Sequence, residues 1–361
     1  MPPDDAPGTM LVADTIEHPP SLVQVIFDGL TLDQKIGQLL MVSLNRSTPV
    51  DTLQDLVATG QVTGVLLLDN GWGASAVQDV TAALRQQAGR IGLYIAVDQE
   101  GGKVQRLSGK GFDKIPPAST QGTWPSDKLT ESAQAWASQL SAAGVNLNLA
   151  PVADTVPASM LHKNKPIGML SRQFGTNPAV VAEHAAAFIQ GMNAGGVQAC
   201  VKHFPGLGRI TGNTDNSTKD ITDGTTTRDS DYVQAFRTAM AAGPAMVMMS
   251  LATYSKIDAK HPAVFSHTMI TDVLRGDLGW DGVVISDALN AAAVKSVPVG
   301  QRAVQFIEAG GDIALFATVA EVNQAASALK QRAQSDEAFA DLIDASVMRV
   351  LKAKAAAGLL S

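Results

Sequence analysis

The chain has 361 residues, enough for one large α/β barrel or for two smaller domains. Lys and Arg number 27 and Asp and Glu 34, so the formal net charge is −7, which argues against a protein that binds nucleic acid through its phosphates. A single cysteine, Cys200 in an apolar run, excludes an intrachain disulfide, a zinc site built from cysteines and a Cys-x-x-Cys redox pair.

The first twenty residues, MPPDDAPGTMLVADTIEHPP, carry acidic residues and prolines where a signal peptide has a basic region and an apolar core. No later segment reaches the roughly 18 consecutive apolar residues of a membrane span. We therefore expect residues 1–25 to form a poorly ordered N-terminal extension and residues 26–361 to form one domain. We expect the chain as given to be cytoplasmic, or to belong to the cell envelope or the exterior if a leader was trimmed.

Short apolar runs rich in Val, Ile and Leu then recur along the chain, as strands buried on both faces of a sheet do. Eight such runs predict strands at 36–42, 62–68, 92–97, 145–152, 197–204, 245–251, 282–289 and 312–317.

Helical spacing fills the stretches between these runs. Residues 126–144 carry one apolar stripe of an amphipathic helix, and Asn177 followed by Pro178 is typical of a helix start. Glycines stand where such helices should end, at positions 60, 144, 195 and 310. Eight strand–helix alternations predict an α/β fold, a single-domain (β/α)8 TIM-type barrel with C-terminal helices. An open doubly wound sheet is the alternative, but DNGWGAS (69–75) is a poor match to its glycine-rich first turn.

Polar residues gather at the predicted carboxyl ends of the strands, where such barrels place their active sites. Two long loops, 153–177 and 205–230, join the same end of the barrel. The strand ends and loops carry Asp98, Arg106, Asp154, Arg172, Lys202, His203 and Asp287.

Several of these residues have both a functional and a structural interpretation. Asp287 is either a salt-bridged carboxylate or a nucleophile kept ionised by the nearby cations. Asp98 and Arg106, in DQEGGKVQR, either belong to a charged turn or bind vicinal hydroxyls of a polyhydroxylated ligand. A single histidine such as His203 often has a structural role. His203 and Lys202 can both face the opening at the carboxyl ends of the strands only if their strand bends or bulges.

These motifs give the chain a family resemblance. It resembles the single-domain bacterial β-N-acetylglucosaminidases of glycoside hydrolase family 3, which are associated with peptidoglycan recycling. The matching segments are LTLDQKIGQLL (30–40), DQEGGKVQR (98–106), LAPVAD (149–154), SRQFG (171–175), VKHFPG (201–206) and GWDGVVISDAL (279–289).

The resemblance implies a retaining glycosidase in which Asp287 is the nucleophile. It also implies that the terminal N-acetylglucosamine is held by Asp98, Arg106, Arg172, Lys202 and His203. Neither a metal nor an organic cofactor is implied. Retaining hydrolysis needs a second group that acts as acid and base beside the nucleophile.

The sequence departs from the family at this second group. Members of this type continue KHFPGHG and then carry an Asp-x-His pair whose histidine is the acid/base, whereas this chain has Leu207 and then Asn213-Thr214-Asp215. Another familiar histidine, after the sixth strand, is replaced by Leu251. In one interpretation Asp215 is the acid/base and Asn213 orients it. In the other, the acid/base is lost.

The sequence therefore predicts an exo-β-N-acetylglucosaminidase that removes terminal β-linked N-acetylglucosamine from peptidoglycan fragments or related glycosides. The alternatives are a catalytically weak or silent carbohydrate-binding protein, a β-glucosidase and a glycoside phosphorylase. The expected partner is a small carbohydrate, without nucleic acid or a membrane span, and the expected oligomeric state is a monomer.

Overall fold

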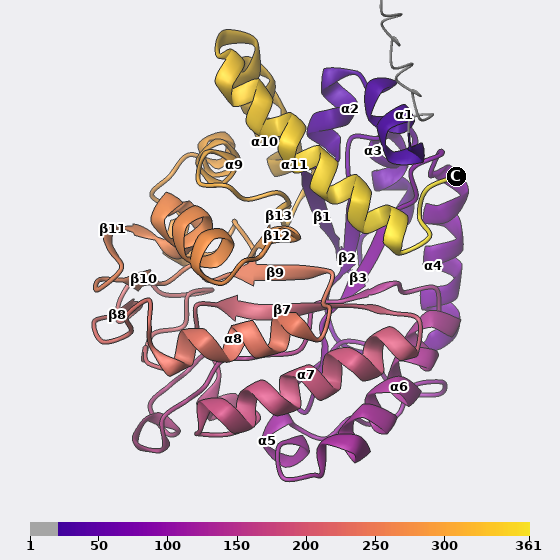
Figure 1. Ribbon diagram of the computed structural model, residues 1–361. Helices are drawn as coiled ribbons and strands as arrows, with labels where there is room; N and C mark the ends of the chain where they lie inside the picture. The colour runs from indigo at the N-terminus through magenta and orange to yellow at the C-terminus, as the bar shows by residue number, and fades with distance from the viewer. Residues whose placement is uncertain (1–20) are drawn as a thin grey trace, which may run out of the picture.

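The computed structural model describes residues 21–361, and its centre is a ring of eight parallel strands (Figure 1). They are hydrogen-bonded in chain order, and a parallel bridge between Ile285 and Ile313 joins the last two and closes the ring. The barrel strands are β1 (Leu40–Leu44), β2 (Gly64–Leu67), β3 (Tyr94–Val97), β6 (Leu147–Asn148), β7 (Gln198–Phe204), β9 (Met246–Met249), β12 (Val283–Ser286) and β13 (Ala314–Phe316). The predicted (β/α)8 barrel is confirmed, and the doubly wound alternative is wrong.

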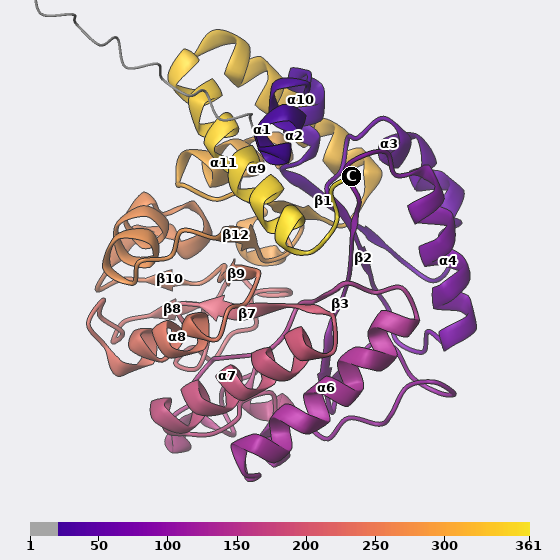
Figure 2. The same ribbon diagram turned by 45° about the vertical axis from the view of Figure 1, so that its right-hand side comes forward.

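Helices that follow the barrel strands in the sequence surround the barrel (Figure 1 and Figure 2). They are α3 (Gln54–Ala58), α4 (Ala74–Gln87), α6 (Ser126–Ala142), α7 (Pro178–Ala194), α8 (Asp231–Ala241), the helical segment Thr268–Asp277, α9 (Val299–Glu308) and α10 (Val319–Ser335). Two helices that precede the barrel, α1 (Leu22–Asp28) and α2 (Leu32–Gly37), pack beside α10 and the last helix, α11 (Glu337–Ala356). Smaller elements decorate the loops: α5 (Ala118–Gln121), the β4–β5 hairpin (Gln99–Gly101 and Val104–Gln105), and a sheet of β8 (Thr222–Asp223), β10 (Thr253–Tyr254) and β11 (Asp258–Pro262).

Two predicted helices form for the reasons expected. The apolar stripe of α6 is buried along its whole length, from Leu129 to Leu140. Helix α7 begins at Pro178, and the side chain of Asn177 accepts a hydrogen bond from the backbone N–H of Ala179 at 2.8 Å. Amphipathic burial and capping thus fix these two helices, as the spacing predicted.

The predicted runs are longer than the strands that form, most clearly at 145–152, where β6 is only Leu147–Asn148, and one run also includes the end of a helix. The run 36–42 is not a strand throughout, because Ile36 and Gly37 end helix α2 and β1 begins only at Leu40. A capping box at Thr31 and Gln34 starts this short helix. Helix end and strand are both fully buried here, so the apolar run is continuous across the boundary.

The predicted extension of residues 1–25 falls largely on residues 1–20, which lie outside the described residues. Within its last part, α1 already begins at Leu22. Across residues 21–361, none of the helices is both long and apolar enough to cross a membrane.

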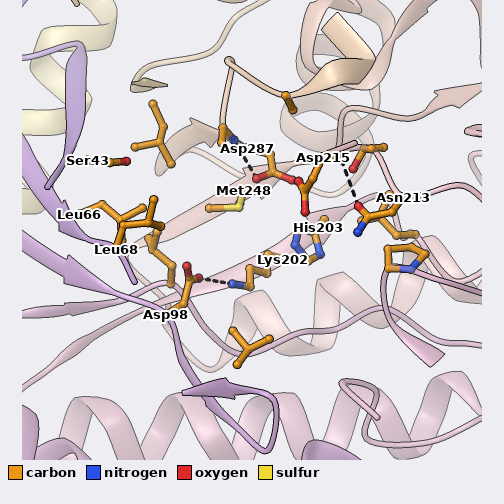
Figure 3. Close-up of a pocket in the computed structure, with 18 of the residues that line it drawn as sticks. Ser43, Leu66, Leu68, Asp98, Lys202, His203, Asn213, Asp215, Met248 and Asp287 are labelled. Atoms are coloured by element: carbon orange, nitrogen blue, oxygen red, sulfur yellow. Dashed lines mark hydrogen bonds and ion pairs between the residues drawn. The ribbon is translucent and has the colours of Figure 1, made fainter. Parts of the chain in front are cut away.

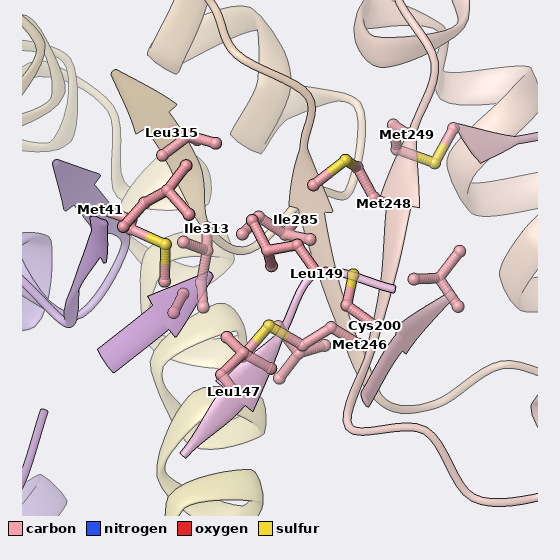
Figure 4. Packing of buried hydrophobic residues seen from close by; sticks show 14 of the residues in the cluster. Met41, Leu147, Leu149, Cys200, Met246, Met248, Met249, Ile285, Ile313 and Leu315 are labelled. Carbon is pink, nitrogen blue, oxygen red and sulfur yellow. The ribbon is translucent and has the colours of Figure 1, made fainter. Parts of the chain in front are cut away.

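The barrel interior is filled with side chains from alternate strand positions (Figure 4). Met41, Leu147, Met246, Ile285 and Ile313 are all buried to 2% exposure or less. Cys200 lies among them, and burial raises the pKa of its thiol, as expected of an inert apolar cysteine.

A buried lysine stands beside this core. The Nζ atom of Lys354, in α11, donates to Oε1 of Gln38 at 2.9 Å and lies 5.5 Å from the centre of the Tyr94 ring. Among residues 21–361 it has no acidic partner, and burial lowers its pKa to about 7.

The buried Lys354 side chain predicts that the free energy of unfolding changes with pH in the neutral to alkaline range. In the unfolded chain a lysine has a pKa of about 10.4. Between about pH 7 and pH 10 the unfolded state therefore binds more protons than the folded state, and the free energy of unfolding rises with pH. Thermal unfolding across this range should show the rise in wild type and a flatter curve in Lys354→Met. The control Lys352→Met, at an exposed position of the same helix, should keep the wild-type slope. An unchanged slope in Lys354→Met would contradict the assignment.

Candidate active site

A cavity of about 390 Å³ opens at the carboxyl ends of the barrel strands (Figure 3). The eight side chains to which the family resemblance gives catalytic or sugar-binding roles line it: Asp98, Arg106, Arg172, Lys202, His203, Asn213, Asp215 and Asp287. Asp154, the other strand-end residue named in the sequence, does not line it. Apolar side chains of the strands, including Leu66, Met248 and Leu315, form the rest of its wall. The barrel therefore gathers residues separated by up to 189 positions in the sequence into one site.

The strands position several of these groups directly. Asp98 and Asp287 each follow the last residue of a strand, β3 and β12. Lys202 and His203 lie within β7, where the pairing with β9 shifts register between Val201 and Phe204. This is the irregularity that two adjacent residues need if both are to line one cavity, and it falls before Pro205 and Gly206.

A buried carboxylate, Glu100, holds two of the cations. Its Oε1 lies 2.7 Å from Nζ of Lys202, and the Arg172 guanidinium donates to both Glu100 oxygens at 2.8 Å. Burial alone would raise the pKa of Glu100, but the charges of Arg172 and Lys202 hold that pKa well below its usual range. Burial works in the opposite direction on Lys202, and there Asp98 and Glu100 outweigh it and raise the pKa. Glu100 is thus ionised and fixes both cations in place.

Asp98 and Arg106 lie nearer the opening. Asp98 accepts from Lys202 at 2.6 Å through Oδ1, while its Oδ2 is 3.9 Å from the Arg106 guanidinium. Arg106 also donates to Oδ1 of Asn70 at 2.9 Å. The side chains of Asp98 and Arg106 are 15% and 24% exposed, so both groups keep polar atoms available to a ligand in the cavity.

A second buried carboxylate, Asp154, orients His203. Oδ2 of Asp154 accepts a hydrogen bond from Nδ1 of His203 at 2.7 Å. Because an ionised carboxylate only accepts, Nδ1 carries the proton in this pair, and Nε2 is the free nitrogen of a ring that lines the cavity.

Asp215 and Asp287 bring two carboxyl groups together. Figure 3 shows them pointing toward one another from opposite segments, with the His203 ring beside Asp215. Oδ1 of Asp287 accepts from the backbone N–H of Ala288 at 2.8 Å. Burial, followed by repulsion from Asp287, raises the pKa of Asp215. This pair is therefore suited to hold one proton on the Asp215 carboxyl.

Asn213 does not orient the Asp215 carboxyl as expected from the sequence. Its Oδ1 accepts from the backbone N–H of Asp215 at 3.0 Å, so it shapes the turn that carries Asp215. The loop is also joined to the segment after β12, because Ala292 and Ala293 donate their backbone N–H groups to the carbonyls of Asp215 and Thr214 at 3.0 and 3.1 Å. Backbone contacts thus place Asp215 over the cavity.

Sequence reasoning missed the supporting roles of Glu100 and Asp154. Both stood in recognised motifs after predicted strands, but their partners come from distant loops and strands. Leu207, where the motif resemblance leads us to expect a histidine, is buried and lines the cavity wall. Among the described residues, no cluster of three or more His, Cys, Asp or Glu side chains is arranged to hold a metal ion.

Comparison with known proteins identifies the family. The glycosyl hydrolase family 3 N-terminal domain matches residues 31–353. The chain belongs to glycoside hydrolase family 3. A β-hexosaminidase of Xylella fastidiosa (strain M23) is 36% identical over 308 residues, which cover 83% of this chain and 88% of that protein.

Solved structures of this family have the same fold. The β-N-acetylhexosaminidase of Beutenbergia cavernae superimposes with a TM-score of 0.85 at 42% identity, covering 90% of this chain and 99% of that one. A family 3 β-N-acetylglucosaminidase of a Paenibacillus strain gives a TM-score of 0.82 at 31% identity, covering 91% of this chain and 63% of that one. The family resemblance predicted from the motifs is confirmed.

The ion pairs of Glu100 predict a large loss of stability when its charge is removed. Glu100→Gln keeps the shape but leaves Lys202 and Arg172 buried without their shared anion, and breaking such a buried pair costs about 3–5 kcal/mol. Urea unfolding measures this loss. The matched control is Asp277→Asn, which breaks an exposed ion pair with Arg228 and should leave the unfolding midpoint unchanged. Equal small effects in both variants would contradict the role of Glu100.

Proposed function

We propose that this chain is a retaining exo-β-N-acetylglucosaminidase, with Asp287 as nucleophile and Asp215 as acid and base. The observation that carries the proposal is the pairing of these two carboxyl groups in one cavity, beside a shell of sugar-binding side chains. Relatives named β-hexosaminidase, and solved structures named β-N-acetylhexosaminidase and β-N-acetylglucosaminidase, support the choice of sugar.

The polar shell holds the terminal sugar in this account. It consists of Asp98, Arg106, Arg172, Lys202 and His203. Carboxylates and guanidinium groups bind neighbouring hydroxyls through two atoms in fixed geometry, and the buried anions Glu100 and Asp154 fix the cations and the imidazole. A cavity of about 390 Å³ that opens only at the carboxyl ends of the strands suits one terminal residue and hence exo action.

In the first step the Asp287 carboxylate attacks the anomeric carbon. The bond to the leaving oxygen breaks as the protonated Asp215 donates its proton to that oxygen, and a covalent glycosyl-enzyme forms. The raised pKa of Asp215 serves this step, because the group must carry a proton before it can donate one.

In the second step water attacks the same carbon and releases Asp287. Glycosylation has neutralised Asp287, so one cause of the raised pKa of Asp215 is gone, and Asp215 becomes a carboxylate that accepts the proton of the attacking water. The cycle restores both groups and inverts the carbon twice, giving retention.

We further propose peptidoglycan fragments as the natural substrates and one copy of the chain as the working unit. The motif resemblance supports the first. The second is supported by the origin of every site residue in a single barrel. The hexosaminidase names of the relatives favour this function over a silent binding protein, a β-glucosidase or a phosphorylase.

The assignment of the acid predicts a dependence on the leaving group. Asp215→Ala should slow hydrolysis of an aryl N-acetyl-β-glucosaminide with a poor leaving group by roughly 100- to 10,000-fold, and that of a good leaving group far less. Asp287→Ala should abolish turnover of both. Steady-state kinetics on both substrates provide the measurement. Equal rates of wild type and Asp215→Ala on the poor leaving group would exclude Asp215 as the acid.

The raised pKa of Asp215 also predicts the alkaline side of the pH profile. Proton donation requires the protonated form, so kcat/KM on the poor leaving group should fall as pH rises through the pKa of Asp215. This alkaline limb should be missing from the profile of Asp215→Ala on the good leaving group. The same limb in wild type and variant would assign it to another group.

A further inference from the structure

Asp154 is a fully buried carboxylate to which the proposed reaction gives no chemical step. It is 0% exposed and stands in the loop after β6. Besides Nδ1 of His203, its oxygens accept two backbone N–H groups: that of His203 at 3.3 Å and that of Leu207 at 2.7 Å. One carboxylate therefore binds both a side chain of the polar shell and the beginning of the loop that carries Asp215.

The beginning of this loop is packed tightly around that hydrogen bond. Asn164 donates to the carbonyls of Leu207 and Ile210 at 2.7 and 2.8 Å, and the Tyr254 hydroxyl donates to the carbonyl of Gly206 at 2.9 Å. At Gly208 a Cβ atom would lie 1.8 Å from the carbonyl oxygen of Thr155, so the loop lies directly on the backbone next to Asp154. Leu207 and Ile210 are buried.

We infer that Asp154 is a positioning residue that places His203 and the Asp215 loop together, so that sugar binding and proton transfer depend on the same buried carboxylate. This inference rests on the proposed function for its kinetic consequences. Its structural part, the anchoring of residues 205–216 to Asp154, does not.

Substitutions of Asp154 can distinguish this positioning role from a general effect on packing. Asp154→Asn keeps the volume of the side chain but replaces one accepting oxygen with an NH2 group. That group faces either the N–H of Leu207, donor against donor, or Nδ1 of His203, which then accepts only if the ring proton moves to Nε2. Asp154→Ala removes both accepting oxygens and so breaks both contacts in every tautomer.

The matched control is Asp312→Asn. Asp312 is also 0% exposed and accepts from Arg275 and Arg349 at 2.8 Å and from the N–H of Val284 at 2.7 Å. It precedes β13, at the amino end of the strands, and does not line the cavity. This variant should lower stability without changing how the activity depends on the leaving group.

The first measurement is kcat/KM on the two aryl N-acetyl-β-glucosaminides. Asp154→Ala should lower it on both, and the loss on the poor leaving group should exceed the loss on the good one by roughly tenfold or more, because the acid is displaced as well as the sugar. His203→Ala, which leaves the Leu207 contact intact, should lower both values by similar factors. An unchanged ratio in Asp154→Ala would overturn the inference.

The second measurement needs no activity. Amide hydrogen exchange followed by mass spectrometry should be faster across residues 205–216 in Asp154→Ala, which cannot accept from Leu207, and unchanged there in Asp312→Asn. If wild type hydrolyses neither glycoside, the proposed function fails, and loop exchange together with calorimetric binding of N-acetylglucosamine still decides the role of Asp154. Unchanged exchange in the loop would overturn the anchoring. If Asp154→Ala does not fold, Asp154→Asn, in which a neutral amide oxygen replaces a charged acceptor, is measured in the same way.

Discussion

The ion pairs of the buried Glu100 with Lys202 and Arg172 are the constraint on which the mouth of the barrel depends. Two cations at the carboxyl ends of hydrophobic strands are costly to bury alone, and a single carboxylate with bidentate geometry compensates both. Lys202 in turn holds Asp98 at 2.6 Å. The groups that face a ligand are therefore fixed before it arrives, so little ordering remains to be done when a sugar binds.

The loop that carries Asp215 must meet two other requirements, a raised pKa of the Asp215 carboxyl group and a fixed position. A carboxyl group that must donate a proton needs a raised pKa, and burial together with the neighbouring Asp287 provides it. The loop also needs a fixed position. Asp154 anchors its beginning through the N–H of Leu207, and the N–H groups of Ala292 and Ala293 hold its far part. The proposed acid and base, Asp215, is thus held by backbone contacts of its loop.

The sequence predicts the fold and the membership of the site well, because both follow from simple patterns. Buried strands read as apolar runs, and residues such as Asp98 and Asp287 are recognisable as polar groups that end them. The partners of Glu100, Asp154 and Asn213 are not predictable in this way, since each choice depends on which backbone or side chain the folded loops bring near. The burial of Lys354 beside Gln38 likewise has no signal in helix periodicity alone.

The most direct measurement of the central claim, that the Asp215 carboxylate is the acid and base, is azide rescue of Asp215→Ala. Azide is a small anion that can use the space left by the carboxylate and attack the glycosyl-enzyme on Asp287 without base assistance. The account predicts that azide accelerates turnover of a substrate with a good leaving group and that the product is the β-configured N-acetylglucosaminyl azide. No acceleration, or no such azide product, would contradict it.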